Sequence, residues 1–103
     1  MCDDAAMTLD EFRATLSAAT PPAVSPALQA LWHDARGDWD TAHKTADEAG
    51  GKAGAWVHAY LHRKERNPDN AAYWYSETGR PLATDSLDQE WERIARTLLA
   101  ARS

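Results

Sequence analysis

Signals that begin and end helices recur along the whole chain and divide it into short segments. A Ser or Asn followed directly by Pro, which combines a good N-cap with a favoured first helical residue, occurs at 25–26 and at 67–68. Capping boxes, in which Ser or Thr is followed three residues later by Glu or Gln, start at Thr8 and Ser86. The closing signals are the glycines Gly37, Gly50, Gly51 and Gly79. Elements between such signals can be only a few helical turns long.

Apolar residues between these signals recur at the spacing of one helical face. The last segment carries the clearest such pattern, at Leu87, Trp91, Ile94, Ala95 and Leu98. The apolar residues of the chain include five Trp and many Ala but few Ile and Val, and this composition favours helix over sheet. We therefore predict an all-α fold, and 103 residues are enough for one domain with a modest core.

The predicted domain, residues 1–103, contains two stacked helix-turn-helix hairpins flanked by an amphipathic helix at each end. Its predicted elements are a helix over 9–19, a Pro-rich connector over 20–25, a hairpin over 26–49, a second hairpin over 53–79 and a C-terminal helix over 86–101. The second helix of the first hairpin carries a small apolar face of Ala42, Ala46 and Ala49, which would let another helix approach closely.

The two hairpin segments resemble each other at an offset of 29 residues. Identical residues at this offset are Ala30 and Ala59, His33 and His62, Asp40 and Asp69, Ala42 and Ala71, Glu48 and Glu77, and Gly50 and Gly79. A period of this size is typical of helical repeat proteins. The structural unit would then be a helical hairpin used twice.

The first unit, ALQALWHDARGDWDTAHKTADEAG, resembles the tetratricopeptide and Sel1-like repeat families. Gly37, Asp38, Trp39, Ala42 and Ala49 occupy the places of their Gly-Asp-aromatic turn and of two following small residues. The second unit departs from the pattern, with Arg, Asn and Pro at its turn. The strings GAWVHAYLHR and AAYWY also resemble short bacterial proteins of unknown activity. The resemblance implies stacked hairpins whose first helices expose a face that binds peptides or proteins.

A polar surface on the first helices of the two hairpins is the predicted binding face. Its members are Gln29, His33, Asp34, His58, His62 and Glu65. We expect a non-enzymatic module that binds a protein or peptide there, with plain solvation of these side chains as the alternative. Aromatic surface left outside a small core would be used in a homodimer, formed through Trp74 or the last helix.

A second hypothesis is a divalent metal site built on His58 and His62, which stand one helical turn apart. The string HAYLH has the histidine spacing of the zinc-protease motif HExxH, but Ala59 replaces its general-base Glu. The proposed third ligand is Glu65, His33 or Asp34. The alternative is that both histidines are exposed polar residues on the side opposite Val57 and Leu61. Apart from this metal, no cofactor is expected.

No other catalytic constellation emerges, and no catalytic residue is predicted. Cys2 lies near the start of the chain, no Ser stands in a GxSxG motif, and the Gly50–Lys52 string lacks the remainder of a phosphate loop. His43, next to the small Ala face, is interpreted as a packed or half-exposed residue rather than a base.

Charge and hydropathy exclude several classes of partner. The net charge of −5 repels nucleic acids and anionic lipids, and Glu65 interrupts the only basic cluster, residues 62–66. No apolar stretch approaches the roughly 20 residues of a membrane span. Asp3 and Asp4 stand where a secretory signal would carry positive charge. We therefore expect a cytoplasmic protein that binds neither nucleic acid nor membranes.

Overall fold

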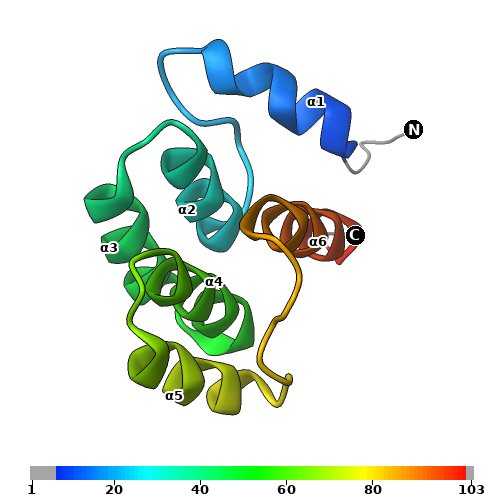
Figure 1. Cartoon of the computed structure of the whole chain (residues 1–103). Helices are drawn as coiled ribbons and strands as arrows, with labels where there is room; N and C mark the ends of the chain where they lie inside the picture. Colours follow the sequence, from blue (N-terminus) through cyan, green and yellow to red (C-terminus); the bar gives the residue numbers. More distant parts are fainter. Residues whose placement is uncertain (1–6, 102–103) are drawn as a thin grey trace.

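The computed structural model describes residues 7–101 and confirms the all-α prediction (Figure 1). These residues form six α-helices and no strand. The helices are α1 (Leu9–Ala14), α2 (Pro26–Ala35), α3 (Trp39–Ala49), α4 (Gly51–Lys64), α5 (Pro68–Thr78) and α6 (Leu87–Ala100). None of them is both long enough and apolar enough to cross a membrane.

The capping residues begin the helices where the sequence predicts. Ser25 and Asn67 each accept a hydrogen bond from the backbone N–H three residues on, and α2 and α5 start at the prolines that follow. Both capping boxes form, at Thr8 and at Ser86. These caps act within one helical turn, and for that reason they can be recognised without knowledge of the tertiary structure.

Two helix boundaries differ from the predicted ones. The helix predicted over 9–19 ends at Ala14 and continues as a 3-10 turn over Thr15–Ser17, where the Thr15 hydroxyl donates to the Phe12 carbonyl. Such bonds to the preceding turn tighten and end a helix. Helix α4 begins at Gly51 rather than near residue 53, because Gly50, whose positive φ of 64° favours glycine, alone separates it from α3.

The two hairpin turns have the same conformation. Residues 36–38 join α2 to α3, and residues 65–67 join α4 to α5. Gly37 has a φ of +84° and Arg66, which lies 29 positions later, has a φ of +65°. The following residues, Asp38 and Asn67, cap their helices with nearly equal angles, φ −107° and −114°. The offset found in the sequence therefore corresponds to a repeated turn geometry.

Helix α4 lies at the centre of the molecule (Figure 1). It packs against α3 and α5 and also contacts α2 and α6, while α1 lies against α6. Every residue from Gly54 to His62 is buried. A helix that is enclosed on most sides has no solvent face, so polar side chains anywhere on its middle turns become part of the interior.

Helices α3 and α4 lie very close to each other at Gly54. A Cβ atom placed there would lie 2.8 Å from the carbonyl oxygen of Ala46 and 3.3 Å from Cβ of Ala49. The small Ala face predicted on α3 is therefore what α4 packs against. Because the two helices are so close here, a polar side chain on α3 and another on α4, both next to this contact, can reach each other.

The change Gly54→Ala tests this close approach, and we expect it to lower the free energy of unfolding by about 1–3 kcal/mol through overpacking. Alanine is otherwise the better helix former, by about 1 kcal/mol. Urea denaturation therefore tests the close approach by whether the free energy of unfolding falls or rises. An increase in stability would mean that the two helices separate freely at this point.

Candidate metal centre

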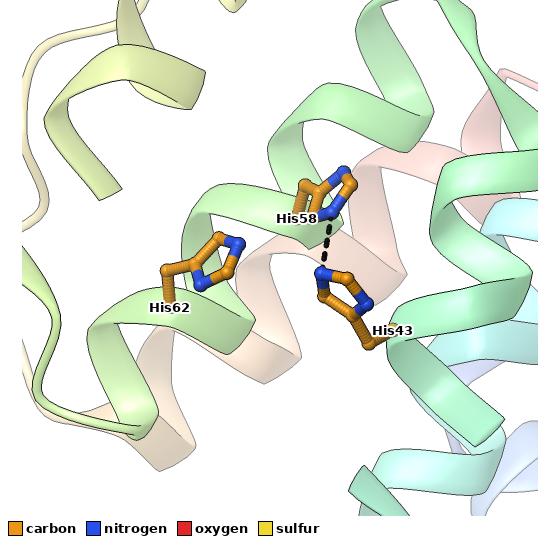
Figure 2. Close-up of side chains that lie close together, drawn as sticks. All are labelled: His43, His58 and His62. Carbon is orange, nitrogen blue, oxygen red and sulfur yellow. Dashed lines mark hydrogen bonds between the residues drawn. The ribbon is translucent and has the colours of Figure 1, made fainter. Parts of the chain in front are cut away.

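Three histidines from α3 and α4 point toward one another (Figure 2). His43 lies on α3, and His58 and His62 lie one turn apart on α4. Each offers one ring nitrogen, and these atoms all lie within 4.8 Å of one another. Nε2 of His58 and Nε2 of His43 are joined by a hydrogen bond of 2.9 Å (Figure 2). The three imidazoles therefore form one cluster of nitrogen donors, named the histidine cluster below.

Two tryptophans stack on the His58 and His43 rings of the histidine cluster. The Trp74 ring stacks on His58 with 4.0 Å between centroids, and the Trp39 ring stacks on His43 at 4.9 Å. Trp39 is itself anchored, because its Nε1 donates to the carbonyl oxygen of Leu61. Stacked aromatic rings restrict the side-chain torsions of the imidazoles and shield the cluster from water.

Glu65 orients the third ring. Its Oε1 lies 2.5 Å from Nδ1 of His62, one turn earlier in the chain. A carboxylate at Nδ1 favours the tautomer with the proton on that nitrogen and leaves the Nε2 lone pair free. Figure 2 shows the Nε2 side of the His62 ring facing the other two histidines. Glu65 therefore acts on the cluster through His62, in the position of a partner to a ligating histidine.

Burial keeps His58 neutral. His58 is only 4% exposed and His62 only 8%. Desolvation, followed by the neighbouring His43 and His62, lowers the pKa of His58 to about 4. At neutral pH this side chain is an uncharged imidazole, which can bind a Lewis acid through Nε2 once its hydrogen bond to His43 is given up. The expectation that these two histidines are exposed is wrong, because α3 and α5 cover the side of α4 opposite Val57 and Leu61.

The remaining residues of the predicted binding face lie in separate places. Asp34 is buried and accepts hydrogen bonds from the Tyr60 hydroxyl and from Nζ of Lys64. Gln29 is half-buried and donates to the Val24 carbonyl. These polar groups are occupied by contacts that hold the fold together.

His33 is also half-buried, with its ring edge-on to Trp32, and it is not part of the histidine cluster. Of the three candidates for a further metal ligand, Glu65 reaches the site only through His62. Protein or peptide binding and homodimer formation stay predictions.

His43 is the site residue that the sequence analysis missed as a ligand. It is half-buried, as interpreted, but it faces His58 rather than serving only as packing. The sequence did contain a signal for this position. The small Ala face on its helix predicted a close helix contact, and a residue next to that face lies at the edge of the contact.

Comparison of the chain with protein-family models, with curated proteins and with solved structures found no match. The resemblance to tetratricopeptide and Sel1-like repeats therefore stays a prediction. The histidine cluster and its surroundings are therefore the basis for proposing a function.

Proposed function

We propose that this protein binds a divalent transition-metal ion through His43, His58 and His62. The observation that carries the proposal is the convergence of three imidazole nitrogens from two helices in a largely buried place. Packing alone does not require three titratable rings to face each other. A cation shared by the three lone pairs would compensate for their removal from water.

The donor set selects the class of ion. Imidazole suits zinc, copper, nickel and cobalt, whereas magnesium and calcium take oxygen ligands. Zinc–nitrogen bonds of about 2.0–2.1 Å in a tetrahedral site place the nitrogens about 3.3 Å apart. The 2.9 Å between Nε2 of His43 and Nε2 of His58 is close to that separation. The three nitrogens lie within 4.8 Å of one another, so metal binding requires the rings to turn until all three reach this separation.

Protein purified without a histidine tag is expected to bind one zinc or cobalt ion per chain, measured by calorimetric titration and elemental analysis. His62→Ala is expected to abolish stoichiometric binding, because two imidazoles remain. Glu65→Gln is expected to weaken binding by roughly 10- to 100-fold, the usual effect of losing the partner of a ligating histidine.

The fourth histidine of the described residues supplies the matched control. His33→Ala removes one imidazole from the chain but none from the histidine cluster, so metal affinity is expected to stay unchanged. Absence of stoichiometric binding by the unmodified protein would overturn the proposal. So would an equal loss of affinity in His33→Ala and His62→Ala.

A further inference from the structure

The histidine cluster provides three donors, whereas a closed structural zinc site has four. No other His, Cys, Asp or Glu among residues 7–101 places a ligand atom within the same 4.8 Å group. Glu65, the nearest carboxylate partner, is bound to Nδ1 of His62 on the side of the ring away from the cluster. The donors from residues 7–101 therefore leave one coordination position of a tetrahedrally coordinated ion unfilled.

The histidine cluster borders open space on its His58 side. His43 is only partly buried, so solvent reaches the cluster from α3. A cavity of about 340 Å³ lies beside His58 and Trp74 and is bounded by the junction of α3 and α4. Its wall includes Asp47, which lies one turn after His43 on α3 and is exposed. Glu77 on α5 is also exposed and lines the same wall, so Asp47 and Glu77 are the two carboxylates beside this cavity that could compete for the position.

Charge identifies the class of ligand. Three neutral imidazoles do not reduce the charge of a divalent ion, so the full +2 charge acts on whatever occupies the fourth position. In a largely buried place this charge strongly favours a water molecule that has lost a proton, or a small anion that replaces it.

Resting on the proposed function, we infer that the metal held by His43, His58 and His62 keeps one exchangeable position, which takes water and small monodentate anions. The site is then an open one, of the kind found where a metal presents a ligand for reaction or exchange. It differs from a closed site that serves only to hold α3 and α4 together.

Cobalt(II) tests the inference, because its visible absorption reports the number and type of ligands. The cobalt-loaded protein is titrated with sodium azide, and a saturable change in the absorption bands is expected, with one azide per cobalt. The same change is expected in His33→Ala, the control outside the cluster, and in Asp47→Asn, since Asp47 is not a ligand in this arrangement.

The outcomes separate the two proposals. If cobalt does not bind the unmodified protein, the proposed function fails. If cobalt binds through the histidines but the bands do not respond to azide, the open position is wrong and the chain closes the site. A response that appears only after Asp47→Asn would identify Asp47 as the fourth ligand and would equally overturn the inference.

Discussion

Replacement of Trp91 by alanine is expected to lower the free energy of unfolding by about 3–5 kcal/mol. The Trp91 ring is 7% exposed and stacks on Phe12, with 5.8 Å between centroids. Its Nε1 donates to the carbonyl oxygen of Leu31, 60 residues earlier in the chain. One side chain thus attaches α6 to both α1 and α2, and its removal would leave a cavity and break the hydrogen bond between α6 and α2. Urea denaturation followed by circular dichroism measures the effect.

A control on the same helix separates this packing effect from a loss of helix propensity. The Arg96 side chain is 66% exposed and contacts only Glu92 of its own helix, so Arg96→Ala is expected to change stability by less than about 0.5 kcal/mol. Should Trp91→Ala cost less than about 1 kcal/mol, α6 would not be docked on the hairpins as described.

Replacement of Glu90 by alanine is the second change with a large expected effect, a loss of about 3–5 kcal/mol. The Glu90 carboxylate is completely buried. It accepts hydrogen bonds from the Tyr75 hydroxyl at 2.6 Å and from Nε1 of Trp56 at 3.3 Å. Its other oxygen lies 2.8 Å from the Arg63 guanidinium. The alanine variant would leave the Tyr75 and Trp56 donors in the interior without their acceptor, and Arg63 would keep only Asp85 as a partner.

Glu92 is the matched control, two residues further along α6. It pairs with Arg96 and more distantly with Arg13, and its side chain is 32% exposed. Surface ion pairs contribute little to stability, so Glu92→Ala is expected to leave the urea midpoint close to that of the unmodified protein. Equal losses in Glu90→Ala and Glu92→Ala, measured by the same urea denaturation, would contradict the structural role given to the buried carboxylate.

Contacts within one helical turn could be predicted from the sequence. The Ser25 and Asn67 caps and the prolines after them predict the starts of α2 and α5, and the structure has these helices begin there. The glycine at position 37 predicts the end of α2 for the same reason. Such signals are local, since a cap and the N–H that it accepts from are three residues apart. The all-helical fold class and most helix boundaries therefore follow from the amino-acid sequence alone.

The candidate site depended on contacts between distant residues. His58 and His62 were recognised as a pair because one turn of helix joins them, but their burial depends on α3 and α5, which cover the remaining side of α4. His43 joins them across 15 positions, and Trp56 reaches Glu90 across 34. The periodicity of a helix indicates which residues share a face, but not how many neighbours cover it. In this chain the sequence determined the helices and one pair of histidines, and only tertiary packing enclosed α4 and assembled the third ring, because those contacts join residues that no local pattern relates.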